Sequence, residues 1–254
     1  MVLAHEVQEP FREESMEEQR NRFCQRDKEL SFHKWDFYDA ARWRFHKSNE
    51  HDVTGAYYLW AYKAAFLQYN RERIIRYARQ EKVPLLLLAG TVVNEVGGKP
   101  DRGKYLIYLK RLFLDDVKNG NNRQSNATSF GAVAMQLRAA AETLGIDPAT
   151  LTTTEQLQLA GCLMDDSFNI QLAARHLRDL ILFDNPQLAD TSHLTEEQFI
   201  VAAARYNRGT QRARSDIIDS LTAPEDAPER EYSSYGRDML KKKRTILEVL
   251  GVHE

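Results

Sequence analysis

One carboxyl group stands where its chemistry should differ from that of a surface glutamate. Glu95 follows the most apolar stretch of the chain, LLLLAGTVV at residues 85–93, and precedes Gly97-Gly98. An apolar wall and the partly negative end of a helix both disfavour a carboxylate, so we expect the pKa of Glu95 to rise. A carboxylic acid that stays protonated near neutral pH can donate a proton to the leaving oxygen of a glycosidic bond. An exposed carboxylate at a frayed helix end is the alternative interpretation.

Four short segments follow Glu95 in the chain. They read SFGAVAMQ at residues 129–136, NIQLA at 169–173, AARYNRG at 203–209 and EYSSYG at 231–236. In this order, over roughly residues 79–250, they resemble the corresponding segments of soluble lytic transglycosylases and goose-type lysozymes. Each segment alone also has an ordinary explanation, as a core methionine, a helix C-cap or a pair of packing tyrosines.

The resemblance implies a lysozyme-like helical domain with a small hairpin. It also implies cleavage of the β-1,4 bond between N-acetylmuramic acid and N-acetylglucosamine in peptidoglycan, with Glu95 as the catalytic acid. The positions that it assigns to substrate binding are Met135, Gln136, Tyr206, Asn207, Tyr235 and Glu231. Among these, Gln136 and Asn207 would offer amides to the sugars, and Glu231 would be a supporting carboxylate.

The chain departs from the family pattern at several of these positions. Val96 stands where the family has serine after the catalytic glutamate, and Val133-Ala134 replaces Gly-Leu before Met-Gln. Arg205 replaces a small residue before the tyrosine, and Tyr232 replaces a threonine. These departures favour the alternative of a non-catalytic module that keeps the fold and binds glycan or a partner protein.

The sequence leaves the second half of the reaction open. Goose-type enzymes position a water molecule, whereas lytic transglycosylases let the muramic 6-hydroxyl attack and form an anhydro end. Asp101, Asp115 or Asp116 could position a water, since all three follow Glu95 closely in the chain. Each is equally compatible with an ordinary solvated carboxylate.

Other reaction types find no support in the residue patterns. The histidines form neither an HExxH motif nor a Cys/His spacing typical of zinc sites. The chain lacks a GxxxxGK[ST] phosphate-binding loop and a GxSxG nucleophile motif. We therefore expect no metal and no cofactor.

The helix that must position Glu95 is clearly marked. It should begin at Val83-Pro84, because proline is tolerated in a first helical turn, and end at Gly97-Gly98. Its apolar residues predict burial on most sides. Upstream, we expect a loop at residues 49–54 and one amphipathic helix over residues 55–76. The many aromatic residues between 35 and 69 are explained by core packing more readily than by stacking on sugars.

Further helices are marked by capping patterns. TTTE at residues 152–155 and TEEQ at residues 195–198 fit the capping box. Asp166 or Ser167 should cap the helix that carries Ile170 and Leu177. The polar residues 119–129 predict a loop or small hairpin, residues 222–230 a loop, and residues 232–250 a closing helix.

Composition sets the broad class of the protein. The 254 residues, 43% of them apolar and 28% charged, are ordinary for a soluble globular protein. We expect a mainly α chain with a helical N-terminal region at residues 1–78 and a lysozyme-like domain at residues 79–254. The formal net charge of −2 gives no general attraction to nucleic acid or to anionic membranes, which disfavours a nucleic-acid-binding protein.

The two cysteines, Cys24 and Cys162, are too few for a disulfide framework. One disulfide between them is compatible with the sequence, but the low count favours two free thiols.

The N-terminal sequence has no basic region followed by an apolar core, as a secretory signal would, and no apolar run is long enough to span a bilayer. We expect synthesis in the cytoplasm and action in the periplasm or cell wall after specialised export. An antibacterial toxin delivered by a type VI secretion apparatus fits this expectation. Residues 1–78 would then contact the secretion apparatus, and an immunity protein would block the cleft. A phage-type endolysin is the alternative.

Overall fold

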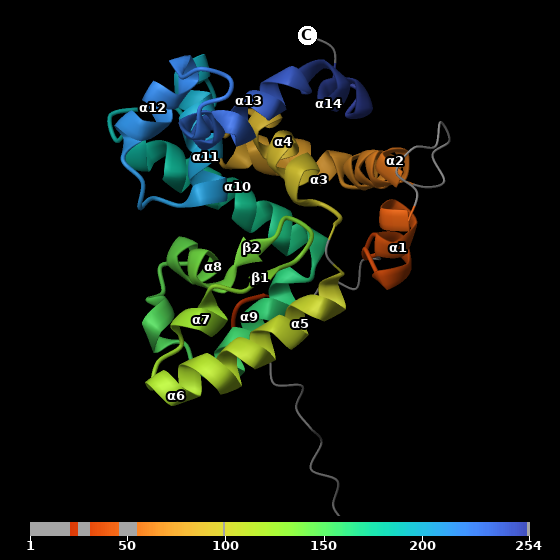
Figure 1. Cartoon of the computed structure of the whole chain (residues 1–254), viewed down its shortest axis with the longest axis vertical. Coiled ribbons are helices and arrows are strands. Elements are labelled where there is room, and N and C mark those ends of the chain that lie inside the picture. Colours follow the sequence, from red (N-terminus) through yellow and green to blue (C-terminus); the bar gives the residue numbers. More distant parts are fainter. Residues whose placement is uncertain (1–20, 25–30, 46–54, 99, 253–254) are drawn as a thin grey trace, which may run out of the picture.

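The computed structural model describes residues 21–24, 31–45, 55–98 and 100–252. In these residues helices form nearly all of the regular structure and the strands form one two-stranded sheet, which confirms the predicted mainly α fold. Figure 1 shows the helices in two groups, with α10 (Asp166–Asp184) running between them. No helix in the described parts of the chain is long and apolar enough to cross a membrane.

The first group surrounds α4 (Leu85–Glu95) and holds the larger of two hydrophobic cores (Figure 1). Leu87 and Leu88 of α4 pack in this core with Ile170 of α10 and Ile246 near the C-terminus. The other elements of the group are α1 (Phe37–Phe45), α2 (Gly55–Tyr69), α3 (Arg71–Gln80), α11 (Glu196–Arg208), α12 (Arg214–Thr222), the 3₁₀ helix η3 (Pro228–Ser233), α13 (Ser234–Lys241) and α14 (Lys243–Val249).

The second group holds the hairpin and a separate core that includes Tyr108, Phe130 and Leu159. Strands β1 (Ser129–Phe130) and β2 (Met135–Gln136) pair antiparallel, with Ser129 opposite Gln136 and Phe130 opposite Met135. The helices of the group are α5 (Asp101–Lys110), the π-helix η1 (Arg111–Asp116), α6 (Val117–Asn119), α7 (Arg123–Asn126), α8 (Leu137–Thr143), the 3₁₀ helix η2 (Pro148–Thr150) and α9 (Thr153–Leu163).

The apolar helix α4 is buried as its sequence predicts. Residues 87–93 are all buried, and the helix starts directly after Pro84 and ends at Glu95. Gly90 lets a neighbouring helix approach closely, because a Cβ there would lie 2.8 Å from Met239 Cγ of α13. Gly97, with φ +84°, turns the chain away after the helix. The end of α4 is therefore held firmly by packing, and Glu95 with it.

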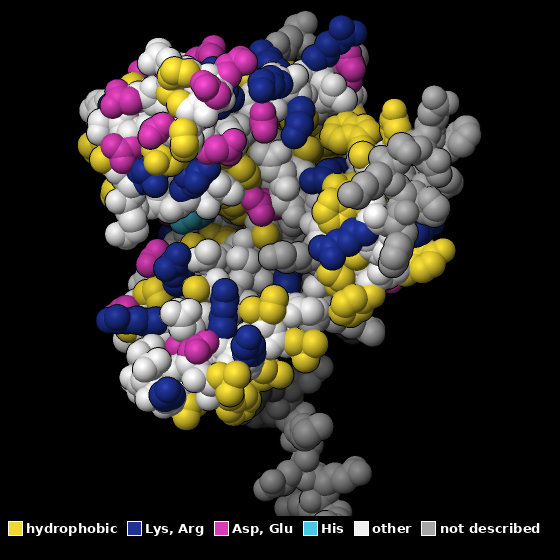
Figure 2. All heavy atoms as spheres, in the orientation of Figure 1, with side chains coloured by type: hydrophobic (Ala, Val, Ile, Leu, Met, Phe, Trp, Pro, Cys, Tyr) yellow, Lys and Arg dark blue, Asp and Glu magenta, His cyan; other side chains and the backbone are white. Residues whose placement is uncertain are grey.

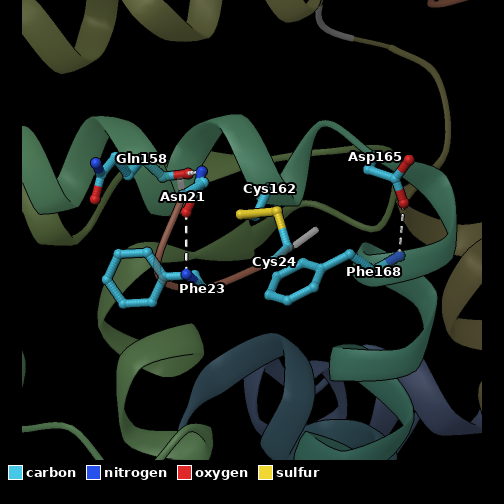
Figure 3. Close-up of a disulfide and its surroundings, with 7 residues drawn as sticks. All are labelled: Asn21, Phe23, Cys24, Gln158, Cys162, Asp165 and Phe168. Atoms are coloured by element: carbon cyan, nitrogen blue, oxygen red, sulfur yellow. Dashed lines mark hydrogen bonds between the residues drawn. A yellow bond between two sulfur atoms is a disulfide. The ribbon is translucent and has the colours of Figure 1, made fainter. Parts of the chain in front are cut away.

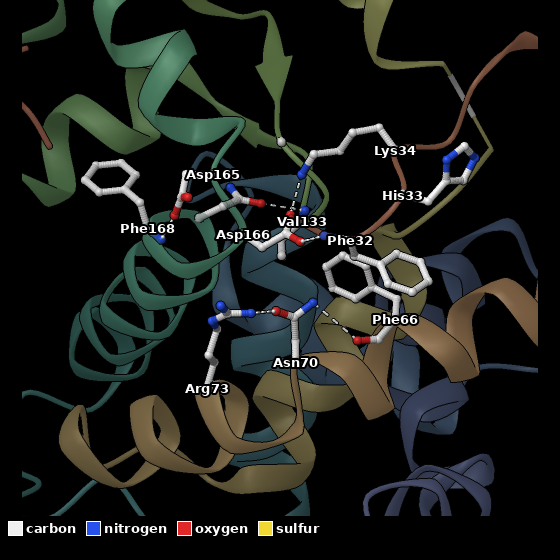
Figure 4. A network of polar contacts seen from close by, with 12 residues as sticks. Phe32, His33, Lys34, Phe66, Asn70, Arg73, Val133, Asp165, Asp166 and Phe168 are labelled. Carbon is white, nitrogen blue, oxygen red and sulfur yellow. Dashed lines mark hydrogen bonds and ion pairs between the residues drawn. The ribbon is translucent and has the colours of Figure 1, made fainter. Parts of the chain in front are cut away.

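The single helix predicted over residues 55–76 is wrong, since it divides into α2 and α3 at Asn70. The buried Asn70 side chain donates to the carbonyl of Phe66 at 3.3 Å and accepts from Arg73 Nη1 at 2.8 Å (Figure 4). Asparagine side chains compete in this way with the backbone bonds of a continuous helix. The closing helix predicted over residues 232–250 also divides, into α13 and α14. Tyr232 lies before α13, in η3, and Lys242 separates the two helices.

The capping predictions are confirmed in two of three cases. Both capping boxes are present, at the starts of α9 and α11. The third helix, α10, is capped by Asp165, whose carboxylate accepts from Phe168 N at 2.8 Å, and not by Asp166 or Ser167. Asp166 instead accepts the backbone N–H of Phe32 at 3.1 Å and pairs with Lys34 (Figure 4). The predicted loop at 49–54 lies outside the described residues.

The expectation of free thiols is wrong, because Cys24 and Cys162 form a disulfide with their Cα atoms 5.9 Å apart (Figure 3). The cysteines meet because residues 21–24 lie along α9. Asn21 Nδ2 donates to the carbonyl of Gln158 at 2.9 Å, and Phe23 packs against the second core. A contact between residues separated by 138 positions leaves no local signal in the sequence.

The division predicted between residues 78 and 79 stays a prediction. Helix α3 runs across this position, and Phe66 and Leu67 share the first core with residues of α4. Helix α1 lies beside α2 in Figure 1. Lys63 of α2 donates to the carbonyls of Val93 and Asn94 at the end of α4, and Leu59 of α2 lies against Gly97. The described part of the N-terminal region therefore helps to support that end.

Candidate active site

A cleft of about 800 Å³ lies between the two groups of helices. Figure 2 shows the surface hollowed between the upper and lower halves of the molecule. Its walls come from the end of α4, from α5 and η1, from the hairpin and α8, and from the end of α11. Among the residues that line it are Glu95, Lys104, Arg111, Met135, Gln136, Arg138, Glu142, His176, Tyr206 and Asn207.

Glu95 lies in the cleft wall, and its carboxyl is largely buried. Burial raises the pKa of Glu95 above the ordinary glutamate value of 4.5, because a carboxylate loses hydration there. Three groups act in the opposite direction and limit the rise in pKa. The Tyr235 hydroxyl donates to Glu95 Oε1 at 2.7 Å, and the positive charges of Lys63 and Lys104 favour the ionised form.

Tyr235 reaches Glu95 from α13, a helix that sits close against α11. The approach depends on Gly236, where a Cβ would lie 2.7 Å from Ile200 Cα. Burial raises the pKa of Tyr235 well above its ordinary value, and the Glu95 charge adds to the rise. The tyrosine therefore stays a neutral donor to the carboxyl group throughout the physiological range.

Tyr206 connects α11 with the hairpin. Its hydroxyl donates to the carbonyl of Val133, in the turn between the strands, at 2.8 Å. The backbone N–H of the same Val133 donates to Asn169 Oδ1 of α10 at 2.8 Å. Burial raises the pKa of Tyr206 well above its ordinary value, and the nearby Glu95 charge raises it further. Tyr206 therefore holds the hairpin turn against α11 and lies near enough to Glu95 to feel its charge.

Gly131 fixes how closely the hairpin approaches α9 and α10. Its φ is +76°, and a Cβ on it would lie 2.1 Å from the Leu163 carbonyl and 2.6 Å from the Asn169 side chain. Only glycine fits a position that is both left-handed and this close to backbone. Beyond the turn, Met135 is buried beneath the cleft and Gln136 is partly exposed in it.

The structure brings together most of the residues predicted to bind substrate. Met135, Gln136, Tyr206 and Asn207 line the same cleft as Glu95, and Tyr235 contacts Glu95 directly. Glu231 does not line the cleft. Its side chain is 73% exposed, and its carboxylate lies 4.0 Å from Arg208 and 3.2 Å from the Ser234 hydroxyl.

Of the three aspartates proposed to position water, two do not line the cleft, and the side chain of the third is not among those described. Asp116 is buried and accepts the backbone N–H groups of Gln124 and Ser125 at 2.8 and 2.7 Å, so it fixes the start of α7. Asp115 lies in η1 and does not line the cleft. Asp101 begins α5, and its side chain lies outside the described residues.

Lys63 belongs to the site, but no motif in the sequence marks it. Its ammonium donates to the carbonyl oxygens of Val93 and Asn94, the latter at 3.4 Å, where α4 ends. Burial lowers the pKa of Lys63 to about 8, the charge of Lys242 lowers it too, and Glu95 opposes the shift. Lys63 thus compensates the carbonyls at the end of α4 and lies near the Glu95 carboxyl.

Glu142 and His176 also line the cleft and were not predicted. Glu142 is exposed on α8, and it is the only carboxyl residue besides Glu95 among the described residues of the lining. Burial lowers the pKa of His176 to about 4, so its ring is neutral near pH 7. The ring contacts the Thr143 hydroxyl at 3.0 Å and meets the Tyr206 ring edge-on at 5.8 Å. No spacing in the sequence relates either residue to Glu95.

The unexpected Arg205 is explained by its own contacts. It is buried and forms a bidentate ion pair with Asp184 of α10, with N–O distances of 2.8 and 2.9 Å. Its third contact is to the carbonyl of Arg212 at 2.6 Å. Arg205 therefore holds α11 against α10 and against the loop after α11. The small residue of the family pattern could make neither contact.

One group of described side chains has a geometry that could hold a metal ion. Ligand atoms of His33, Asp36 and Asp39 lie within 4.8 Å of one another. Hydrogen bonds account for this arrangement, because the carboxylates of Asp36 and Asp39 each accept the backbone N–H of the other residue at the start of α1, and Tyr58 donates to Asp39. None of the three lines the cleft.

Comparisons with protein-family models, with curated proteins and with solved structures found no match.

Proposed function

We propose that the protein cleaves peptidoglycan between N-acetylmuramic acid and N-acetylglucosamine, with Glu95 as the general acid. The observation that carries the proposal is a buried carboxyl with a raised pKa that opens onto a cleft of about 800 Å³. The order of the segments after Glu95, which resembles soluble lytic transglycosylases and goose-type lysozymes, supplies the substrate class. Gln136 and Asn207 line the same cleft and offer amide groups to the sugars.

The first step is transfer of the Glu95 proton to the glycosidic oxygen. The bond from this oxygen to the muramic-acid carbon breaks, and positive charge develops on the sugar ring. The carboxylate left on Glu95 accepts the Tyr235 hydrogen bond and lies near the charges of Lys63 and Lys104. The groups that limit the rise of the Glu95 pKa therefore also stabilise the product of proton transfer.

The second step returns a proton to Glu95. In a hydrolase the proton comes from an attacking water, and in a transglycosylase it comes from the muramic 6-hydroxyl. Glu142 lines the same cleft as Glu95, and holding that water is the role that it would have in a hydrolase. The proposal covers both outcomes, because the acid and the bond that breaks are the same.

The disulfide between Cys24 and Cys162 supports action in an oxidising compartment, where such bonds persist. The bacterial periplasm and cell wall meet this condition and contain the proposed substrate. We therefore propose an antibacterial toxin delivered by a secretion apparatus, with an immunity protein that blocks the cleft. A phage-type endolysin would have the same chemistry.

The test uses purified cell walls and three proteins: the wild type, Glu95→Gln and the matched control Glu229→Gln, whose residue is exposed outside the cleft. Loss of turbidity and release of soluble muropeptides are measured. We expect the control to match the wild type and Glu95→Gln to release at least about 100-fold less, the usual contribution of a general acid. Equal, negligible release by all three would leave a glycan- or protein-binding module and exclude the enzyme.

A further inference from the structure

The cleft has a charge balance that differs from that of the whole chain. The chain has a formal net charge of −2. The cleft lining, in contrast, contains six basic residues and two acidic ones, Glu95 and Glu142. Two of the six have a carboxylate partner, since Arg205 is paired with Asp184 and Arg208 lies 4.0 Å from Glu231. The remaining excess of positive charge faces the space where the substrate strand would lie.

Two of these cations, Arg111 and Arg138, each donate to a side chain at or next to the same rung of the hairpin. Arg111, in η1, donates from Nη1 to Thr128 Oγ1 at 3.2 Å, and Thr128 directly precedes Ser129. Arg138, at the start of α8, donates from Nε to Gln136 Oε1 at 2.6 Å. Ser129 and Gln136 are register partners. Two guanidinium groups from different elements are thus positioned beside one rung at the wall of the cleft.

The partners of both arginines are neutral. Within the described residues neither Arg111 nor Arg138 forms an ion pair with a carboxylate. Each guanidinium has five N–H donors and uses one in the bonds above, so further donors remain. A planar guanidinium fork matches a carboxylate or phosphate in two parallel bonds, which makes an anionic ligand the natural complement of this pair.

We propose that Arg111 and Arg138 form a carboxylate-binding subsite that recognises the short peptides borne by the glycan strand. This inference rests on the proposed function and names a specificity that the function alone does not require. In an intact wall the lactyl group of muramic acid is amide-bonded to the peptide, so free carboxylates are offered by the peptide and not by the sugars. A strand held in the cleft with a peptide over the hairpin brings such carboxylates to the two guanidinium groups.

The experiment compares two substrates, intact cell walls and the same walls stripped of peptides by an amidase. The proteins are the wild type, Arg111→Gln, Arg138→Gln and the control Lys110→Gln, which removes an exposed positive charge of α5 that does not line the cleft. Thermal unfolding is measured to check that each variant is folded. Arg138 is exposed, so its substitution leaves the core intact.

On intact walls we expect each arginine variant to release muropeptides about ten-fold more slowly than the wild type, the scale of one charge-assisted hydrogen bond. The Lys110→Gln control should match the wild type. Stripping the peptides should slow the wild type by a similar factor and bring it close to the arginine variants. Added salt should reduce the difference between wild type and variants on intact walls.

Failure of the proposed function and failure of the arginine subsite give different results in this experiment. If the wild type releases nothing from either substrate, the proposed function fails. If the wild type cleaves both substrates and the arginine variants match it on intact walls, the subsite is overturned while the enzyme stands. If the arginine variants stay ten-fold slower than wild type on stripped strands, the carboxylate bound is the exposed lactyl group, and the assignment to the peptide is overturned.

Discussion

The hydroxyl of Tyr235 donates a 2.7 Å hydrogen bond to Glu95 Oε1 and so joins α13 to the end of α4 across 140 positions of sequence. This bond favours the carboxylate, whereas burial favours the protonated acid. Burial is the larger of the two effects, so the pKa of Glu95 is raised overall. Tyr235 is thus the one hydrogen-bond donor among the three groups that limit the rise of the Glu95 pKa, beside the charges of Lys63 and Lys104.

Tyr235→Phe should raise the pKa of Glu95 further, because it removes the donor to the carboxylate. The basic limb of the pH profile of kcat/KM should then move to higher pH. We expect kcat to fall about ten-fold, since the carboxylate formed by proton transfer loses a charge-assisted bond. Tyr232→Phe, at a residue that packs on Arg212 instead, is the control. A Tyr235→Phe profile that overlays the wild-type profile would contradict this role.

The stability of the protein should report the ionisation of Glu95. Its raised pKa means that the folded state binds this proton more tightly than the unfolded state does. The stability linked to the proton is fully present below pH 4.5, the ordinary value, and is lost as pH rises through the folded pKa. Glu95→Gln stays neutral, so it should be more stable than wild type at pH 7 and equal to it near pH 4. Urea denaturation at both pH values measures the free energy of unfolding of each protein. A Glu95→Gln variant less stable than the wild type at pH 7 would count against a raised pKa of Glu95.

Cys24→Ser should destabilise the protein by up to about 4–5 kcal/mol, the entropy cost associated with closing a very long loop in the unfolded chain. The disulfide joins residues 138 positions apart. Urea denaturation of the wild type with a reducing agent should give the same loss, and the variant should not respond to the reductant. Wild-type protein that reacts with a maleimide before reduction would show that the thiols are free.

Gly131→Ala and Gly120→Ala form a matched pair. Both glycines have positive φ, +76° and +62°, so both substitutions carry the backbone cost, about 1 kcal/mol. Only the Gly131 Cβ would also lie 2.1 Å from a backbone carbonyl, whereas nothing lies within 4 Å at Gly120. Gly131→Ala should therefore cost about 3 kcal/mol or more, since overpacking adds to the backbone cost, and should displace the hairpin. Equal unfolding midpoints of the two variants would contradict the close packing at Gly131.

The parts of the fold that local patterns encode could be predicted. The burial and end of α4, and with them the setting of Glu95, follow from a run of apolar residues between a proline and a glycine pair. The capping boxes of α9 and α11 are encoded within four residues each. The meeting of Met135, Gln136, Tyr206 and Asn207 in one cleft agrees with the expectation from the order of the segments.

Features that depend on contacts between distant elements could not be predicted. Lys63 reaches the end of α4 from another helix, and the Cys24–Cys162 disulfide depends on residues 21–24 lying along α9. Nothing near Asn70 marks it as a break, because asparagine also occurs within helices. Glu231 matched a motif but lies exposed outside the cleft, since η3 directs this part of the chain toward Arg208.

The mass of the soluble muropeptides released from purified cell walls tests the central claim most directly. Cleavage with Glu95 as the acid predicts disaccharide peptides from the wild type and at least about 100-fold less of them from Glu95→Gln. Hydrated reducing ends would identify a hydrolase, and ends lighter by one water would identify a transglycosylase. Release of the same products in the same amount by Glu95→Gln, or products in which every glycosidic bond is intact, would contradict the account.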